Sequence, residues 1–557
     1  MSLVVTEINK LNQLFEKFKN YANPNLKTSI FVLSYGENSN RCNVRDFYGK
    51  NLKQSWEKLY SFYRTLPKNN VYIRVDLIVE ESTITYEELV QKIARIKRSN
   101  YVEFGIRLEG SKKRIFLKEE LTANAILVPH PNHIIGKNSP RMEFNFLNYK
   151  GYVKRKYNIQ DHALNYIPNS KIYIFKTKAF FIETDKMYEL KDYGHGSHVR
   201  EINDDNLEEN LDLVIDEGAH YLLDQLDDEG KFTYGYFPCY DNEIRNYNSI
   251  RHFSSLYALL ESGEFLKEEA LIQKSFEGLT WGFENLSEEI QGHYFIKDYE
   301  KERMEIKLGA QAMAILAAAK YTKITGDTQF FDKMKALTQT IEACFIDENE
   351  ETIHVLNDSL DVLDKFRVIY YDGEALFSLL RAYELMQDAE IFRISQRLMT
   401  IFVNNNYEQY SDHWLSYAVN EFLRYDQKNE YYVFGLKNAL NQMDSIESRV
   451  HAAPTKLELL VAAAKMIVKL EKYDCREEVI SNEEFLVAKQ RIFEVMDHRA
   501  YHELVTGVMF PELAMYFKAP DKIEYGFYIR NDRFRMRIDD AEHFLSGFVN
   551  YQTLMKE

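Results

Sequence analysis

Hydrophobic residues recur with two different periods along the chain. In roughly the first 190 residues, short apolar runs rich in β-branched and aromatic residues predict strands. These runs lie at 30–35, 71–79, 104–108, 114–117, 171–175 and 179–184. The last two are typical of a closing hairpin. Two stretches between strands, 55–65 and 86–97, place apolar residues three and four positions apart, which predicts helices. We therefore expect an α+β domain here.

The pattern changes near residue 205, after which amphipathic segments follow one another to the end. Twelve helices are predicted, at 204–226, 247–262, 265–284, 305–323, 328–346, 370–387, 388–404, 411–425, 428–444, 454–471, 483–499 and 538–554. Short breakers at 261–264 and 325–327 favour antiparallel hairpins. The turns after Tyr321 and Tyr383 have similar sequences, as expected of a repeated unit.

Six such hairpins can close into a ring. The predicted fold class is therefore multidomain, α+β and all-α. An α+β domain of unknown role over 1–195 precedes an (α/α)6 toroid of about twelve helices over 196–557.

Composition narrows the function classes. The 557 residues are 45% hydrophobic and 28% charged, which is typical of a folded, water-soluble chain. No apolar run reaches the ~18 residues that span a membrane, and the amino terminus lacks the order of an export signal. We therefore expect a cytoplasmic protein.

A net charge of −16 argues against nucleic acid as a partner. Glycine-rich phosphate loops are absent and the four cysteines lie far apart, so neither a cofactor nor a metal site is predicted.

Polar residues gather where the even-numbered helices begin. Segments 308–319 and 459–465 are apolar and rich in small residues, as expected for the inner helices of a ring, so the even-numbered helices are assigned to the inside. The polar clusters lie at 247–252, 303–307, 370–374, 411–414, 455–458 and 537–543. If the inner helices run parallel, their leading ends converge on one face. The pattern then predicts a single polar pocket.

The chemistry of such a pocket favours a carbohydrate ligand. Helix amino termini attract anions and polarised oxygens, and crowded carboxylates and imidazoles exchange protons near neutral pH. Tyrosine and tryptophan rings add flat surfaces on which a sugar can stack. The catalytic candidates are Glu374, Asp412, His413, Asp539 and His543. The substrate-binding candidates are Tyr247, Asn248, Arg251, His252, Lys307, Tyr371, Trp414, Glu458 and Arg537.

Each cluster also has a structural interpretation. Asp412 and Asp539 occur where N-caps and first-turn acids are common. His252 lies on an otherwise apolar helix, where a histidine is more often structural than catalytic. Glu374 and Glu458 can form ion pairs between helices. The recurrence of polar clusters at all six helix starts favours a shared pocket.

Residues 200–557 resemble the six-hairpin (α/α) toroids of glycoside hydrolases, polysaccharide lyases, and the N-acylglucosamine 2-epimerase and uronyl epimerase families. The resemblance rests on the number of helices and on the sequences at 247–252, 371–375 and 412–414. In the 2-epimerases a histidine pair moves a proton on and off a sugar carbon, which the resemblance assigns to His413 and His543. In the hydrolases two carboxylates flank the bond, which it assigns to Glu374 with Asp412 or Asp539.

The first domain resembles the AMMECR type through residues 103–109 and 113–117. That family brings no settled chemistry. The resemblance leaves a binding or a packing module as the interpretation of this domain.

Three functions stay open at this point. The leading interpretation is a carbohydrate-active, glycoside hydrolase-like enzyme with acid/base chemistry on a sugar or oligosaccharide. The first alternative is a sugar or uronyl epimerase that uses the histidine pair. The second is a non-enzymatic scaffold that binds a glycan, a peptide or a protein, because helical rings often serve as binding surfaces. A lanthionine cyclase-like enzyme would need a Cys/His zinc site, which the separated cysteines argue against.

Overall fold

The computed structural model describes residues 11, 13–66, 72–96, 102–109, 114–129, 142–159, 171–183, 186–300, 303–348, 351–449, 451–530 and 533–557. The chain forms two compact units. Unit 1 comprises Met1–Asn206, Tyr236–Glu243 and Val505–Met536, and unit 2 comprises Leu207–Gly235, Ile244–Leu504 and Arg537–Glu557. The expected domains are separated by a single cut after residue 195, whereas each unit is assembled from three stretches of chain.

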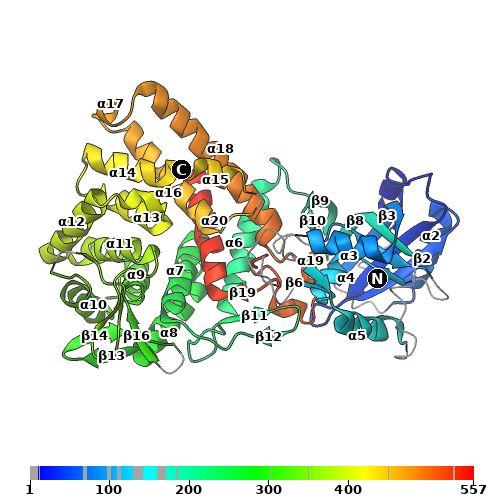
Figure 1. The fold of residues 1–557 in the computed structure, drawn as a ribbon, viewed down its shortest axis with the longest axis horizontal. Coiled ribbons are helices and arrows are strands. Elements are labelled where there is room, and N and C mark those ends of the chain that lie inside the picture. Colours follow the sequence, from blue (N-terminus) through cyan, green and yellow to red (C-terminus); the bar gives the residue numbers. More distant parts are fainter. Residues whose placement is uncertain are drawn as a thin grey trace. The chain divides into compact units, whose positions relative to one another are not determined.

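Unit 1 is built on an antiparallel sheet with helices on its faces (Figure 1). The strands are β1 (Ser29–Gly36), β2 (Asn43–Gly49), β3 (Tyr72–Ile84), β4 (Gly105–Leu108), β5 (Arg114–Phe116), β8 (Ile172–Glu183), β9 (Lys186–Gly194) and β10 (Ser197–Arg200). Their order is β10-β9-β8-β3-β1-β2, and β4 pairs with β8 and β5. The helices are α2 (Leu52–Tyr63), α3 (Tyr86–Arg95), α4 (Lys118–Ala123) and α5 (Phe146–Tyr157). Apolar residues of α2 and of α3 and α5 belong to two separate buried clusters.

The hairpin predicted at 171–184 is wrong, because this segment is one strand, β8. β8 pairs along the length of β3. The residues between the two apolar runs, Lys176-Thr-Lys178, include none of the Gly, Pro, Asn or Asp residues that favour a turn. The hairpin closes instead between β8 and β9. In the segment that resembles the AMMECR type, Lys113 lies outside the described residues, and that resemblance stays a prediction.

Residues 505–536 join unit 1 through buried ion pairs. Arg200 on β10 donates from Nε and Nη2 to the carboxylate of Glu512, at 3.0 and 2.7 Å. Glu512 lies in α19 (Pro511–Ala514), and both side chains are almost completely buried. Arg74 on β3 donates to the main-chain carbonyl of Glu512 at 3.1 Å. Charge pairing therefore fixes this late segment to strands from the beginning of the chain.

We expect Glu512→Gln to lower the free energy of unfolding of unit 1 by about 3–5 kcal/mol, because it leaves the guanidinium of Arg200 buried without its counter-charge. Urea titration followed by circular dichroism measures the effect. Glu16→Gln removes only the exposed pair with Lys19 and should leave stability nearly unchanged. Equal stability of the two variants would contradict this account of the segment.

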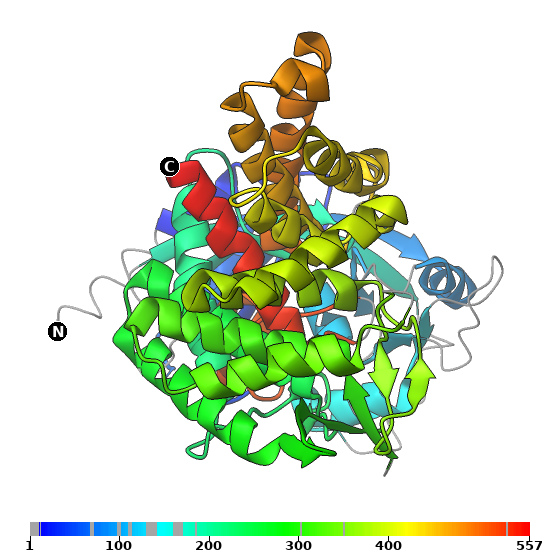
Figure 2. The same cartoon turned by 90° about the vertical axis from the view of Figure 1, so that its left-hand side faces the viewer.

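Unit 2 is a ring of helical hairpins. Its inner helices are α7 (Ser249–Leu266), α9 (Leu308–Thr325), α11 (Tyr370–Met386), α13 (His413–Phe422), α16 (Thr455–Glu471) and α20 (Ile538–Lys556). Each packs against the next in this order, and α20 packs against α7, which closes the ring. The helices α6 (Leu207–Leu223), α8 (Glu269–Asn285), α10 (Phe331–Cys344), α12 (Ala389–Asn404), α14 (Asn429–Leu440) and α18 (Asn482–Gly507) alternate with them along the chain. Figures 1 and 2 show these helices from two directions, with α20 in red.

The chain thus has an α+β amino-terminal part followed by an (α/α)6 toroid, and the predicted fold class is confirmed.

The remaining helical turns are α15 (Met443–Glu447), α17 (Arg476–Val479), η3 (Tyr407–Tyr410) and η4 (Pro520–Lys522). The remaining strands are β6 (Leu127–Pro129), β7 (Met142–Phe144), β11 (Gly235–Phe237), β12 (Asn242–Glu243), β13 (Ser287–Ile290), β14 (His293–Ile296), β15 (Asp298–Glu300), β16 (Arg303–Lys307), β17 (Val355–Leu356), β18 (Val362–Asp364) and β19 (Met536–Arg537).

The inner helices are buried around much of their circumference because they contact neighbours on both sides. In α9 every residue from Leu308 to Ala319 is buried. The one amide in this run, Gln311, is satisfied by the main chain of Ile296 at 2.7 and 2.8 Å. The predicted start of this helix at 305 is wrong, because 303–307 form β16, which pairs with β15 and β17. Among the described helices, none has the length and apolar character that crossing a membrane requires.

Candidate active site

The leading ends of five inner helices bring charged side chains into one cluster in unit 2. Arg251, in the first turn of α7, contacts Asp539, in the first turn of α20, with 2.6 Å between Nε and Oδ2. A carboxylate on α16 lies between histidines of α13 and α20. The cluster consists of Arg251, Glu374, Asp412, His413, Glu458, Arg537, Asp539 and His543.

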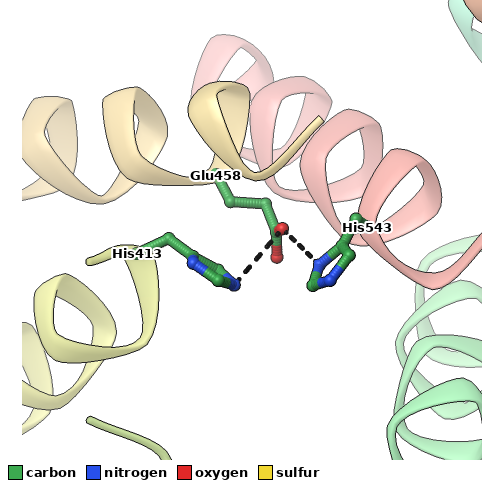
Figure 3. A group of neighbouring side chains, drawn as sticks. All are labelled: His413, Glu458 and His543. Atoms are coloured by element: carbon green, nitrogen blue, oxygen red, sulfur yellow. Dashed lines mark hydrogen bonds and ion pairs between the residues drawn. The ribbon is translucent and has the colours of Figure 1, made fainter. Parts of the chain in front are cut away.

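Glu458 forms the centre of the cluster between two imidazoles, which point toward it from opposite sides (Figure 3). Its Oε2 lies 2.8 Å from Nδ1 of His543 and 3.8 Å from Nε2 of His413. The two ring centroids are 5.2 Å apart. Glu458 and His413 are buried, whereas the side chain of His543 is 20% exposed. One buried carboxylate therefore bridges a buried and a partly exposed imidazole.

The pKa values of the two imidazoles are shifted in opposite directions. Burial lowers the pKa of His413 to about 3, and the charge of His543 acts in the same direction, against that of Glu458. Burial also disfavours the cation at His543, but the carboxylates of Glu542 and Glu458 outweigh it and raise its pKa to about 10. At neutral pH the cluster therefore contains a neutral imidazole beside an imidazolium.

The surroundings of His413 leave one of its nitrogens available. Nδ1 lies 3.3 Å from Oδ1 of Asp412, and the buried Nε2 has no hydrogen-bond partner among the described residues. A proton on Nδ1 leaves the lone pair of Nε2 directed toward Glu458 and His543. Asp412 is the N-cap of α13 and accepts the main-chain N–H groups of Trp414 and Leu415, both at 3.0 Å. Asp412 therefore both caps α13 and lies beside the imidazole of His413.

Glu374 on α11 is buried, and its Oε2 has no hydrogen-bond partner among the described residues. Burial raises the pKa of Glu374 to about 8, and the charge of Asp412 adds to the shift while His543 acts against it. Gly309 on α9 makes room for this carboxyl group. A Cβ at Gly309 would lie 2.3 Å from Oε2 of Glu374 and 2.6 Å from the ring of Tyr371. Glu374 is therefore a protonated carboxyl group at neutral pH in a tightly shaped site.

We expect Gly309→Ala to displace Glu374 and Tyr371, with a loss of stability of about 1–3 kcal/mol, because the added methyl group overlaps both side chains. Thermal unfolding measures the loss. Gly547→Ala is the matched control on inner helix α20, where the new Cβ would lie 3.3 Å or more from the side chain of Leu457. If both alanine variants melt at the wild-type temperature, Gly309 does not shape the site.

The remaining carboxylate of the cluster, Asp539, is held by two cations. Its Oδ2 lies 2.6 Å from Arg251 and 3.0 Å from Arg537, whereas its buried Oδ1 has no hydrogen-bond partner in the described structure. Arg537 also forms a 3.0 Å pair with Asp540, which accepts the N–H of Arg537 and so caps α20. Arg251 donates to the hydroxyl of Tyr234 at 2.7 Å and is about one-third exposed. Asp539 thus joins two arginines from the leading ends of α7 and α20.

Several predicted substrate-binding residues form hydrogen bonds or ion pairs within the protein, as structural residues do. His252 is completely buried, and its two nitrogens bond the Tyr247 hydroxyl and the Gly278 carbonyl at 2.8 and 2.9 Å. Asn248 caps α7 by accepting the N–H of Arg251. Lys307 is buried at the end of β16 and pairs with Asp298 at 3.0 Å. Among the described residues, these side chains form no hydrogen bond, ion pair or ring contact with His413, Glu458 or His543.

The rings of Tyr371 and Trp414 are buried. Tyr371 lies beside Glu374 and contacts the ring of His354, with centroids 5.3 Å apart. Trp414 belongs to a layer of aromatic rings with Tyr257, Phe377 and Tyr417. Neither ring is an open stacking surface. The half-buried Tyr370 has its centroid 5.1 Å from that of His413, so it is better placed to contact a ligand of the cluster.

Sequence reasoning missed three members of the site. Tyr417 donates to Oε1 of Glu458 at 3.2 Å, Glu542 lies 3.2 Å from Nδ1 of His543, and the buried Glu503 on α18 is electrostatically coupled to Glu458 and His543. Tyr417 follows His413 by four residues, so helical spacing would have placed it on the same face. Glu542 adjoins His543 in the sequence. Glu503 carries no recognisable signal, because it lies near the end of α18, whereas the predicted clusters lie at the starts of inner helices.

The His413–Glu458–His543 cluster also has the composition of a metal site. One ligand atom of each residue lies within 4.8 Å of the others. Two imidazoles and a carboxylate form a ligand set that zinc accepts in catalytic sites. The sequence predicts no metal site, so any reaction proposed at this cluster has to be tested with a chelator.

No family model and no curated protein sequence matches the chain. Solved structures do. Cellobiose 2-epimerase from Bacillus thermoamylovorans is 13% identical with a TM-score of 0.44, over 62% of this chain and 99% of that one. A D-mannose isomerase is 9% identical with a TM-score of 0.47, over 63% and 99%. A family 76 glycoside hydrolase from a bovine Bacteroides thetaiotaomicron strain is 10% identical with a TM-score of 0.43, over 87% and 97%. The resemblance to toroid enzymes that the sequence predicted is thus found among solved structures.

Proposed function

We propose that this protein is a carbohydrate-active enzyme that moves a proton at a carbon next to the carbonyl of an open-chain sugar, as a sugar epimerase or isomerase does. The observation that carries the proposal is the pair of imidazoles with opposite pKa shifts on one buried carboxylate. A neutral and a cationic imidazole are the base and the acid that such a reaction needs at neutral pH. The proposal places epimerisation or isomerisation before hydrolysis, whereas the sequence alone favours hydrolysis.

In the proposed reaction, Nε2 of His413 accepts the proton from the sugar carbon and the electron pair moves onto the carbonyl oxygen. The imidazolium of His543 then supplies a proton. Protonation of the same carbon on its other face gives the epimer. Protonation of the neighbouring carbon, with transfer of the hydroxyl proton onto the former carbonyl oxygen, gives the isomer. The proton on His413 then passes along Glu458 to His543, which restores both imidazoles. The exposed fraction of His543 lets its proton exchange with water, and Arg251 and Arg537, which both pair with Asp539, offer donors for sugar oxygens.

The test is solvent deuterium exchange. We would incubate the protein in D₂O with glucose, mannose, N-acetylglucosamine and cellobiose and follow the C1 and C2 protons by NMR. Replacement of a C2 proton by deuterium, with appearance of the epimer or the ketose, is the expected result. EDTA treatment should leave the rate unchanged, because the proposed acid and base are side chains. Loss of exchange on EDTA treatment and its return with zinc would replace this mechanism by a metal-assisted one.

Glycoside hydrolysis is the second candidate, and Glu374 favours it. A carboxyl group with a pKa of about 8 and an unpaired oxygen has the properties of a general acid for a leaving glycosidic oxygen. The partner carboxylate in this reading is Asp412 or Asp539. Release of reducing ends from oligosaccharides, lost in Glu374→Gln and kept in His413→Gln, would favour hydrolysis. Sugar binding without exchange or hydrolysis would favour the scaffold.

A further inference from the structure

A cavity lies in the ring, at the trailing halves of the inner helices. It has a volume of about 350 Å³ and is lined by residues of α7, α11, α13, α16 and α20. This volume is at the small end of the range for ligand sites. The aromatic layer of Tyr257, Phe377, Trp414 and Tyr417 lies between this cavity and the histidines, because Trp414 adjoins His413 and Tyr417 reaches Glu458. This layer therefore divides the cavity from the histidines, and Tyr417 belongs to the lining of both.

Two lysines face the cavity from one side of α16. Lys465 and Lys469 are four residues apart and so share a helix face. Nζ of Lys465 donates to Oδ1 of Asn550 at 2.6 Å, and Nζ of Lys469 donates to the main-chain carbonyl of Asn420. Both acceptors are neutral. Within the described part of the chain, neither ammonium group has a carboxylate within ion-pair distance.

The acids of the lining differ in their partners. Glu421 pairs with Arg424 and, at 3.3 Å, with Arg381. Glu261 accepts a 2.8 Å hydrogen bond from the hydroxyl of Ser546, and its charge and that of the exposed Glu557 oppose the lowering of the pKa of Lys465 by burial. The two lysines are therefore the cations of the lining that have no carboxylate within ion-pair distance in the described structure.

Leaving an ammonium group in a desolvated site without a counter-charge is unfavourable. Burial lowers the pKa of Lys465 and lowers that of Lys469 to about 8. Glu421 on α13 opposes the shift at Lys469, whereas Arg424 on α13, Lys465 on α16 and Arg381 on α11 add to it. An anion placed between the two lysines would stabilise both charges.

We propose that this cavity binds a small phosphorylated organic compound, with its phosphate group between the ammonium groups of Lys465 and Lys469 and its remainder against Tyr257, Phe377 and Tyr417. Two point charges four residues apart suit a phosphate, whose oxygens accept several charge-assisted hydrogen bonds. The proposal does not depend on the reaction at His413 and His543.

The experiment measures binding of inorganic phosphate, glucose 6-phosphate and glucose to the full chain by calorimetry at pH 7. We expect both phosphates to bind, glucose 6-phosphate more tightly, and glucose not to displace them. Lys465→Met and Lys469→Met should each weaken phosphate binding at least about tenfold, the size of a lost charge-assisted contact. Lys472→Met, on the exposed end of the same segment, is the matched control and should bind as wild type.

A structural role for Lys469, as a cap on the carbonyl of Asn420, predicts a different outcome. Lys469→Met would then lower the melting temperature without changing phosphate affinity, and that result would overturn the proposal. Lys469→Arg keeps the charge and should restore binding. Because Lys469 loses its proton above about pH 8, affinity should fall as the pH rises from 7 to 9, and binding at pH 8.5 should take up protons.

Two further outcomes separate this cavity from the candidate active site. His413→Gln should bind phosphate as wild type does, and Lys469→Met should keep deuterium exchange. Failure of both phosphates to bind at 10 mM or below, or loss of their binding in His413→Gln, would show that the cavity is not the anion site.

Discussion

His413→Gln should reduce solvent deuterium exchange into the sugar by about 10³-fold, within the range of about 10²–10⁴ that a general base contributes. Glutamine keeps a polar side chain of similar reach but has no nitrogen that accepts a proton. Nε2 of His413 is the one nitrogen of the pair that is buried, neutral at pH 7 and without a hydrogen-bond partner in the described structure. The rate is measured by NMR in D₂O at saturating sugar, so that kcat is separated from KM.

The control for this variant is His220→Gln, on outer helix α6, where the imidazole is 42% exposed and pairs with Glu268. It should exchange deuterium at the wild-type rate. The melting temperature of His413→Gln should stay near that of wild type, because an imidazole with one unpaired nitrogen is replaced by an amide of similar size. Full exchange in His413→Gln would remove this residue from the reaction.

Glu458→Gln should lower the rate and move the alkaline limit of activity to lower pH. His543 must carry its proton to act as the acid, and its pKa of about 10 places the wild-type limit there. Removing the charge of Glu458 lowers that pKa, by about one to three units, the usual effect of one close charge. The pH profile of kcat measures the shift. Glu264→Gln, at a half-exposed site on α7, should leave the profile unchanged.

The same substitution changes how stability depends on pH. The pKa of His543 is higher in the folded protein than its ordinary value of 6.5, so its stabilising contribution is complete below about pH 6.5 and is lost as the pH rises to about 10. In Glu458→Gln this decline should become shallower and end at lower pH. A decline identical to that of wild type would mean that Glu458 does not hold the proton on His543.

Local patterns in the sequence predicted most of the secondary structure correctly. The 3.6-residue period of apolar positions between 205 and 557 identified the helices of the ring, and the small-residue run at 308–319 identified an inner one. The prediction of secondary structure fails where a segment becomes a strand by pairing with another strand that is distant in the sequence. Lys176–Lys178 were interpreted as a turn because the strand that pairs with them, β3, lies a hundred residues earlier. Glu305–Lys307 are predicted as helix because β17, the strand that pairs with Ile306 and Lys307, follows much later in the sequence.

The same difference between local patterns and long-range contacts applies to the candidate site. The sequence by itself determined that polar residues open the inner helices, because helix starts and periodicity are local properties of a few consecutive residues. Only the tertiary structure decided which of these residues act on one another. Glu458 meets His543 across 85 residues, and the resulting burial and charge, not either residue alone, make one imidazole neutral and the other cationic. Electrostatic interactions depend on distance through space, and no local pattern records that distance.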